Sequence, residues 1–242
     1  MTSTLVARDW AEIQERMLVP LYEAVYDRLD IGPGTRLLGL DCGAGLALLL
    51  GAARGARVTG AEPDPERLAL ARERRLDVAA APPAAGGAGY DVLAAFSPDA
   101  VADLGRVLPL VRRGGAVVLT GWGPAERCAT LTVLGAQWRL PPRRDGLEEV
   151  AAAAGLQPDG SGRVFCPFGY ADMESAVRGL LSASRSPGAG TGAGAGGFGA
   201  DPAAADPAQA EKELAESLHP YARADGTVWL PNVFRYVIAR VP

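Results

Sequence analysis

Residues 37–46 read LLGLDCGAGL, and this stretch decides the fold of the chain. It is apolar as far as Leu40, turns acidic at Asp41 and becomes rich in glycine before a helical run begins at Leu46. A short apolar run of this kind suits a central parallel strand that is buried on both faces. Gly43 and Gly45 let the backbone of the following turn approach a ligand closely. The stretch therefore predicts a strand, a glycine-rich turn and a helix that together bind a ligand.

Strand and helix patterns alternate along the chain around this unit. Strands are expected at 36–40, 56–61, 90–96 and 116–121, and helices at 46–54, 64–75 and 99–111. The Ala, Pro and Gly residues of 77–89 leave room only for a very short third strand, and a turn is expected at 113–115. Strands that alternate with helices favour an α/β fold with a doubly wound, mostly parallel sheet and helices on both faces.

The two ends of the chain extend this core. Apolar residues at helical spacing predict one or two N-terminal helices, and these residues are Ile13, Met17, Leu21, Val25 and Leu29. Further helices are expected at 125–134, 145–154, 172–184 and from 206, with strands at 163–167 and 227–239. Residues 185–207 have almost no side chains to bury, so we expect a flexible surface loop there, with a lid over the site as the alternative.

The composition narrows the classes of function. With 242 residues and a formal net charge of −4, the chain suits one domain and has no electrostatic reason to bind nucleic acid. No apolar run approaches the roughly 18 residues of a membrane span, and the N-terminus lacks the apolar region of a secretory signal. A cytoplasmic protein without a membrane partner is therefore expected. Cys42, Cys128 and Cys166 are widely spaced beside a single histidine, which favours neither a disulfide framework nor a metal site.

Glu62 closes the second predicted strand, beside the glycine-rich turn. An acid at this place can accept hydrogen bonds from both hydroxyls of a ribose. A dinucleotide-binding turn of the pattern GxGxxG would need a third glycine at position 48, where the chain has Leu48. The pattern therefore favours a nucleoside ligand and argues against a dinucleotide-dependent oxidoreductase.

Several segments resemble those of class I S-adenosylmethionine-dependent methyltransferases, of the small-molecule type found in bacterial secondary metabolism. RLLGLDCGAGLALL resembles the first motif of this family, and GARVTGAEPDPERLALAR resembles the strand and helix that follow it. YDVLAAFSPDA and LGRVLPLVRRGGAVVL are similar to the fourth strand, the next helix and the fifth strand. The resemblance covers roughly residues 34–121 and is looser beyond them. It implies a Rossmann-like sheet of seven strands, with an antiparallel last strand beside the fifth, and S-adenosylmethionine as cofactor.

The resemblance also assigns roles to residues at the carboxyl ends of the strands. The implied cofactor contacts come from Asp41, Gly43, Gly45, Glu62, Phe96 and Ser97. Family members usually carry an acid at position 39 and a glycine at position 41, whereas this chain has Gly39 and Asp41. Both positions share one face of the strand, so Asp41 is expected either to reach the amino group of the cofactor or to crowd the turn. Asp77 is the only candidate for the acid that the family places beside the adenine.

The expected organisation is a single domain over 1–242. Its parts are an N-terminal helical cap at 1–33, a cofactor-binding core at 34–121, substrate-side helices and a strand at 122–184, the loop at 185–207, and a final helix and strand at 208–242. A flat, apolar acceptor is expected to lie against aromatic side chains of the cap and the later segments. The residues chosen for this wall are Tyr22, Trp122, Phe168 and Tyr170.

A sulfonium methyl group is already activated, so the main task of such an enzyme is to hold donor and acceptor in line and to exclude water. A general base is needed mainly for a hydroxyl or carbon nucleophile, and His219 is the catalytic candidate, with an exposed helix end as the alternative. Asp99 is expected to cap a helix.

The leading interpretation is methyl transfer to oxygen or nitrogen of a small molecule, and a homodimer stays open. The first alternative is a relative that uses the cofactor for cyclisation or decarboxylation. The second is a binding protein that has lost the cofactor, which the exchange at positions 39 and 41 suggests.

Overall fold

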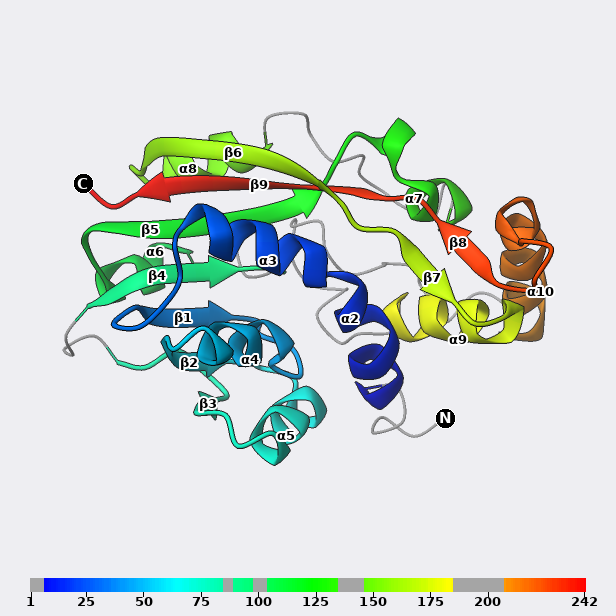
Figure 1. Ribbon diagram of the computed structural model, residues 1–242, viewed down its shortest axis with the longest axis horizontal. Coiled ribbons are helices and arrows are strands. Elements are labelled where there is room, and N and C mark those ends of the chain that lie inside the picture. The colour runs from blue at the N-terminus through cyan, green and yellow to red at the C-terminus, as the bar shows by residue number, and fades with distance from the viewer. Residues whose placement is uncertain (1–6, 85–88, 98–103, 135–145, 185–206) are drawn as a thin grey trace.

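The computed structural model describes residues 7–84, 89–97, 104–134, 146–184 and 207–242 (Figure 1). Within these residues, seven strands form one sheet in the order β3-β2-β1-β4-β5-β9-β6. Strands β1 to β5 pair in parallel, and β9 runs antiparallel between β5 and β6. The predicted Rossmann-like, doubly wound sheet with an inserted antiparallel last strand is thus confirmed. Asp99 and 185–206 of the expected loop lie outside the described residues.

The elements follow the predicted alternation closely. The strands are β1 (Arg36–Leu40), β2 (Arg57–Ala61), β3 (Val78–Ala79), β4 (Tyr90–Ala95), β5 (Val111–Trp122), β6 (Gln157–Phe165), β7 (Phe168–Tyr170), β8 (Val228–Leu230) and β9 (Val233–Arg240). The α-helices are α2 (Glu15–Met17), α3 (Val19–Arg28), α4 (Leu46–Ala53), α5 (Pro65–Glu73), α6 (Leu104–Val107), α7 (Ala129–Leu134), α8 (Gly146–Ala153), α9 (Met173–Ser184) and α10 (Pro207–Leu218). A π-helical stretch, η1 (Trp10–Gln14), precedes α2, and short 3₁₀ turns are η3 (Leu108–Leu110), η4 (Ala125–Arg127) and η7 (His219–Tyr221).

Two apolar clusters sandwich the sheet, because neighbouring residues of a buried parallel strand point to opposite faces. Leu37 of β1 packs into a cluster with residues of α3, α4 and α5. Leu38, its neighbour, packs on the other face with residues of α6 and α8. The near-continuous apolar runs of the sequence are therefore explained by helices on both faces of the sheet.

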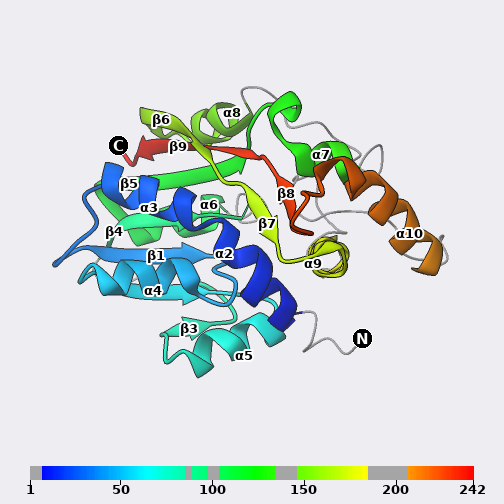
Figure 2. The ribbon, with the colours of Figure 1, turned by 45° about the vertical axis from the view of Figure 1, so that its right-hand side comes forward.

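A second layer of structure lies beyond the carboxyl ends of the parallel strands. It contains the two-stranded sheet β7-β8 together with α7, α9 and α10, and η1 and α2 lie on the same side (Figures 1 and 2). We call this whole second layer, from η1 and α2 to α10, the cap. It faces the end of the sheet where the glycine-rich turn follows β1. The arrangement places the N-terminal segment and the later insertions around the predicted binding region.

Two predicted elements are wrong in detail. The single final strand expected at 227–239 is divided into β8 and β9, because Pro231 has no backbone N–H and Asn232 turns its buried side chain toward α7. The Asn232 amide donates to Thr130 Oγ1 at 2.9 Å, and its oxygen accepts from the Thr130 N–H at 3.0 Å. The turn expected at 113–115 is instead an irregularity within β5, where Tyr90 pairs with Val111 but Val92 pairs with Ala116.

The packing of Leu48 gives a test of this fold. A Cβ placed at Gly60 would lie 2.7 Å from Leu48 Cδ1 and 2.8 Å from Cys42 Sγ, so Leu48 fits only because β2 carries no side chain there. Gly60→Ala is expected to lower the free energy of unfolding by about 2 kcal/mol through overpacking. Chemical denaturation measures this change. The control is Gly105→Ala, at an exposed position of α6 with no atom within 4 Å of the added Cβ. Equal stability of Gly60→Ala and the unaltered protein would contradict the packing described.

Candidate functional site

The turn between β1 and α4 has the backbone geometry of a ligand-binding turn. Gly43 and Gly45 adopt left-handed conformations, with φ values of 61° and 86°, and Gly45 is the N-cap residue of α4. Asp41 also has a positive φ, 43°, which glycine adopts at less cost. Aspartate therefore occupies this position in a conformation of higher energy than glycine would, and the glycine that the family resemblance implied at position 41 would suit this backbone.

Glu62 joins the end of β2 to this turn. Its carboxylate accepts the backbone N–H of Gly43 at 2.7 Å and that of Asp64 at 2.9 Å, and the residue is only 2% exposed. Asp64 in turn caps α5 by accepting the N–H groups of Glu66 and Arg67, both at 2.9 Å. The acid expected to bind ribose is therefore fixed beside the turn by the backbone on either side.

The surroundings of Glu62 alter its ionisation. Burial raises the pKa of this carboxyl to about 7, although the Asp64 N–H, the Arg67 charge and the Gly43 N–H act to lower it. The nearby charge of Asp41 adds to the increase. An acid that is half protonated near neutral pH is unusual, and such groups cluster at functional sites.

Apolar side-chain atoms surround position 39 closely. A Cβ at Gly39 would lie 3.0 Å from Leu48 Cδ2 and 3.3 Å from Cys42 Cβ, both apolar neighbours. A carboxylate at position 39 would therefore point into a buried apolar region without a partner. Leu48, the residue that breaks the dinucleotide pattern, is also the residue that fills the space at position 39.

Side chains of the N-terminal segment cover the turn. A Cβ placed at Gly43 would lie 2.6 Å from Trp10 Cζ3 and 3.1 Å from Glu15 Oε1. Glu15, which is 1% exposed, accepts the Leu46 N–H at 3.0 Å, and Arg74 donates to Glu15 at 3.0 Å and to the Ala44 carbonyl at 2.7 Å. The donors and acceptors around the turn fit a nucleoside, but in this conformation Trp10 and Glu15 fill the space that its sugar and side chain would need.

Two of the predicted cofactor contacts lie at the tip of β4. Phe96 and Ser97 are partly buried there, and the Phe96 ring packs edge-on against Tyr22 with 4.6 Å between ring centroids. Tyr22 is 4% exposed, and burial raises the pKa of its phenol well above the usual value. The structure therefore brings a predicted cofactor contact and a predicted acceptor contact together beneath the N-terminal helices.

The other predicted acceptor residues belong to one apolar cluster. Trp122, at the end of β5, lies edge-on to Phe168 with 5.9 Å between ring centroids, and both pack near Phe234. Tyr170 is buried two residues after Phe168 on the same face of β7, and its hydroxyl accepts a hydrogen bond from Gln14 at 2.8 Å that connects β7 to η1. All of these rings belong to the packed interior or its margin, and their role toward an acceptor stays a prediction.

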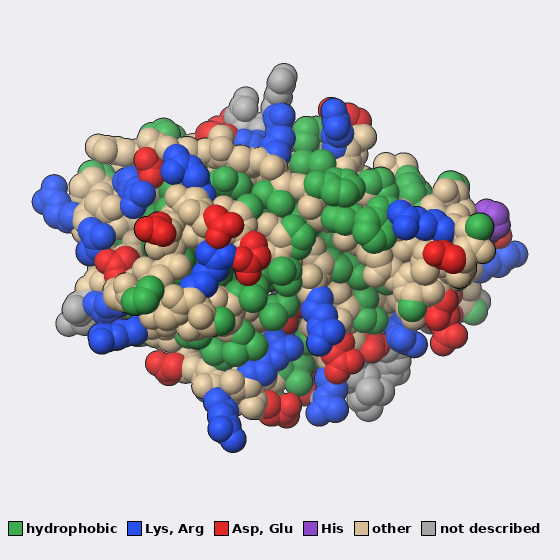
Figure 3. Space-filling model, viewed as in Figure 1, with side chains coloured by type: hydrophobic (Ala, Val, Ile, Leu, Met, Phe, Trp, Pro, Cys, Tyr) green, Lys and Arg blue, Asp and Glu red, His purple; other side chains and the backbone are tan. Residues whose placement is uncertain are grey.

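Two candidate acids or bases lie away from the turn. His219 is exposed in η7, and the single histidine is seen at the outer edge of the molecule in Figure 3. Asp77 is exposed and precedes β3, where its carbonyl accepts the Gly60 N–H at 2.9 Å. An acid beside the adenine would have to follow β3, so Asp77 does not have the position that the family pattern requires.

Four residues that surround the turn were missed by the sequence analysis. They are Trp10, Glu15, Arg67 and Arg74. A signal for Glu15 does exist, because the polar pair Gln14 and Glu15 falls on the buried helical face that includes Ala11. Two polar residues on an otherwise apolar stripe indicate partners inside the protein, although the pattern does not identify them.

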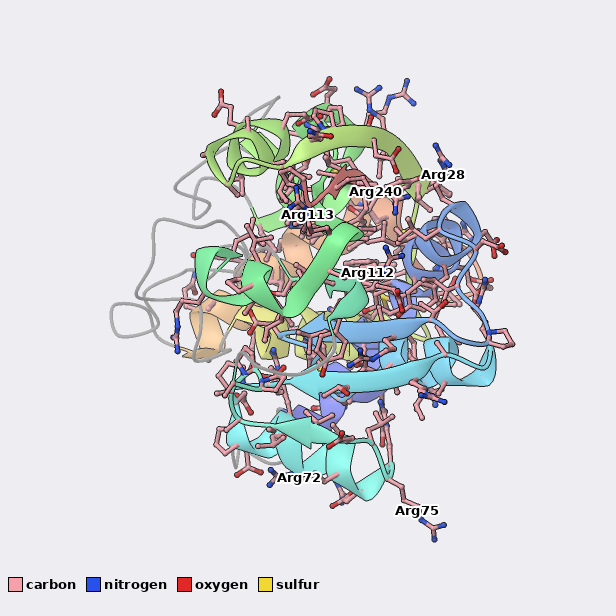
Figure 4. The ribbon with its side chains drawn as sticks, turned by 90° about the vertical axis from the view of Figure 1, so that its left-hand side faces the viewer. Arg28, Arg72, Arg75, Arg112, Arg113 and Arg240 are labelled. Carbon is pink, nitrogen blue, oxygen red and sulfur yellow. The ribbon has the colours of Figure 1, made fainter. Side chains whose placement is uncertain are left out.

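The rest of the described structure contains no competing site of a familiar kind. No group of three or more His, Cys, Asp or Glu side chains that could hold a metal occurs among the described residues. Arg28, Arg112, Arg113 and Arg240 lie on the side opposite the cap (Figure 4), and two of them form ion pairs, Arg112 with Asp91 and Arg240 with Asp159. In the part of the chain that the structure covers, no helix is both long and apolar enough to cross a bilayer.

Comparisons with known proteins agree with this architecture. No family model matches the chain, and no curated protein sequence matches it. Among solved structures, the phosphoethanolamine N-methyltransferase 2 of Haemonchus contortus, in complex with S-adenosylhomocysteine, superposes with a TM-score of 0.56 at 16% identity, over 99% of this chain and 58% of that one. A presumed methyltransferase from Bacillus halodurans gives a TM-score of 0.56 at 10% identity, over 90% and 98%. The [4+2]-cyclase SpnF gives 0.53 at 19% identity, over 92% and 80%. The chain therefore has the fold of class I S-adenosylmethionine-dependent methyltransferases.

The raised pKa of Glu62 gives a pH-dependent stability. Between pH 4.5 and about 7 the folded state holds a proton on Glu62 that the unfolded chain has released, so the free energy of unfolding falls as pH rises through this window. The total loss is roughly 3 kcal/mol. The side chain of Glu62→Gln cannot ionise. Its free energy of unfolding is expected to differ from that of the unaltered protein at every pH, but it should not fall between pH 4.5 and about 7. Urea denaturation at a series of pH values measures both proteins, and parallel profiles would contradict the assignment.

Asp41→Gly is expected to lower the pKa of Glu62, because it removes a neighbouring negative charge. The glycine also suits the left-handed backbone at this position. The upper end of the pH window should then move downward, while the lower end, set by the unfolded chain, stays at pH 4.5. Asp30→Gly is the matched control, since Asp30 has a φ of 52° at an exposed position and does not contribute to the Glu62 shift. An unchanged window in Asp41→Gly would show that the two carboxylates are not coupled.

Proposed function

We propose that the protein transfers a methyl group from S-adenosylmethionine to an oxygen or nitrogen of a small-molecule acceptor. The observation that supports this most is the buried Glu62 carboxylate, bound to the Gly43 N–H at the point where β1 and β2 end. In doubly wound sheets, ligands bind outside the carboxyl ends of the strands. One structural neighbour is named as an N-methyltransferase and was solved with S-adenosylhomocysteine, which supports this reaction on the fold.

Glu62 has the capacity for the proposed ribose contact. Its two oxygens each accept one backbone N–H, and a carboxylate has about four acceptor positions in total. Two acceptor positions therefore remain for the two ribose hydroxyls once the covering side chains have moved. The turn at Gly43 and Gly45 would supply bare backbone beneath the sulfonium side chain, and Asp41 would lie close to its amino group.

The remaining residues would position the acceptor and exclude water. The cofactor supplies an activated methyl group, so alignment accounts for most of the required acceleration. Phe96 and Ser97 are proposed beside the cofactor, and Tyr22, Trp122, Phe168 and Tyr170 on the acceptor side. His219 remains the proposed base. Because it is exposed in η7, either the acceptor would have to bind beside it or the cap would have to move for His219 to reach the acceptor nucleophile.

A second function has support from one comparison. The [4+2]-cyclase SpnF shares the fold at 19% identity, and its name describes a cyclisation. The residues that meet at the turn, Glu62, Glu15 and Asp41, are carboxylates that could stabilise a permanently bound sulfonium cation. A protein of this kind would bind the cofactor without consuming it. A binding protein without the cofactor is the third possibility, and it would not need the raised pKa of Glu62.

Domain organisation, partners and location are also proposals. We propose one domain, with the helical cap, cofactor-binding core and substrate-side segments at the boundaries predicted above. A small-molecule acceptor, with no nucleic acid or membrane partner, is proposed from the charge and composition. A cytoplasmic location and a homodimer are proposals that the structure does not test.

Glu62→Ala is expected to weaken binding of S-adenosylhomocysteine by tenfold to a hundredfold, because two hydrogen bonds to a charged acceptor are lost. Isothermal titration calorimetry measures the change, and thermal unfolding of the free variant checks that it folds. Asp77→Ala is the control, since Asp77 is an exposed acid on the far end of β3 and should leave the affinity unchanged.

The outcome separates the candidate functions. Equal affinity of Glu62→Ala and the unaltered protein would refute the ribose contact, and no binding by either would favour the protein without cofactor. Where binding is found, S-adenosylhomocysteine formed per product molecule distinguishes methyl transfer, which gives one, from cyclisation, which gives none.

A further inference from the structure

The N-terminal segment occupies the place where the proposed cofactor would bind. Trp10 lies over Gly43, and Glu15 accepts the first free N–H of α4 through Leu46. Glu15 of this segment therefore bonds one backbone N–H at the turn, and the Trp10 ring covers Gly43. We infer that residues 10–15 form an autoinhibitory gate, which competes with the nucleoside for the glycine-rich turn and must open before the ligand enters.

Two side-chain contacts that hold Trp10 and Glu15 over the turn come from α5. The Arg67 guanidinium lies 4.1 Å from the centroid of the Trp10 ring, and the Arg74 guanidinium pairs with Glu15 at 3.0 Å. Both arginines project from α5 or its C-cap toward the N-terminal helix. These contacts are one cation–π contact and one ion pair, and the Glu15 bond to the turn adds to them. Within the same segment, Gln14 donates to the Tyr170 hydroxyl of β7 at 2.8 Å.

The packing behind these contacts is incomplete. A groove of about 330 Å³ separates the N-terminal helix from α5, and it is lined by Arg8, Ala11, Glu12, Leu70, Glu73 and Arg74. Trp10 itself is only partly buried. The groove lets the Trp10 side chain leave the turn on the α5 side, while Ala11 and Gln14, which are 3% and 5% exposed, keep the other side of the segment against the interior. Helix α3, with the fully buried Leu21 and Val25, stays fixed to the sheet. The backbone that would move is η1, whose π-helical winding is less stable than an α-helix.

This inference rests on the proposed function. If Trp10 and Arg74 only supported the structure, their replacement would weaken ligand binding or leave it unchanged, whereas a gate predicts that their replacement strengthens it. If the open form is a minor population, the apparent affinity is reduced by that fraction, and loosening the gate restores it. Trp10→Ala and Arg74→Ala are each expected to tighten S-adenosylhomocysteine binding at least fivefold. Arg74→Ala tests the gate without altering the N-terminal helix, in case Trp10→Ala does not fold.

The experiment is calorimetry of the full chain with S-adenosylhomocysteine, with Arg75→Ala as control. Arg75 follows the same helix but is exposed and points away from the gate (Figure 4). Stopped-flow fluorescence adds a second readout, since the observed rate should saturate with ligand concentration in the unaltered protein and rise in Arg74→Ala. Equal or weaker binding by both variants, with the unaltered protein binding, would overturn the gate while the proposed function stands. No binding by any variant would overturn the proposed function, and with it the gate.

Discussion

The hydrogen bond from the Gly43 N–H to the Glu62 carboxylate is the contact on which the site depends. It joins the ends of two adjacent parallel strands, and it does so through a buried acid that burial alone would keep neutral. The sheet brings the two residues together, since β1 and β2 pair in register up to Leu40 and Ala61. Glycine at 43 and the capped start of α5 then fix the direction of the acid. The chemistry of the site is thus a consequence of strand pairing.

The same region explains how this chain departs from the usual pattern of its fold. Leu48 fills the space beside Gly39 and Gly60, so a side chain at position 39 would be tightly packed against apolar atoms, while Asp41 takes a left-handed position that glycine would adopt more readily. The negative charge near the turn is retained, but it comes from Asp41 and from Glu15 of the N-terminal helix. A change of packing in the strand is accompanied by a different arrangement of charge around the same ligand space.

Most of the fold could be predicted from the sequence, because strands such as 36–40 and helices such as 46–54 carry strong local patterns. The division of the last strand could not, since it depends on the contact between Asn232 and Thr130, 102 residues apart. Glu62 and Gly43 were predicted from the order of strand, turn and acid. Glu15 and Trp10 were missed because their partners belong to α4 and α5, and helical spacing alone does not show which element a helix will face.

The central proposal is that a nucleoside binds at this turn through Glu62. A crystal structure of the protein with S-adenosylhomocysteine tests it most directly. The expected result is a ribose whose two hydroxyls lie within about 3 Å of the Glu62 oxygens, with the Trp10 ring withdrawn from Gly43. A ligand bound elsewhere, or one at the turn with no contact to Glu62, would contradict the claim.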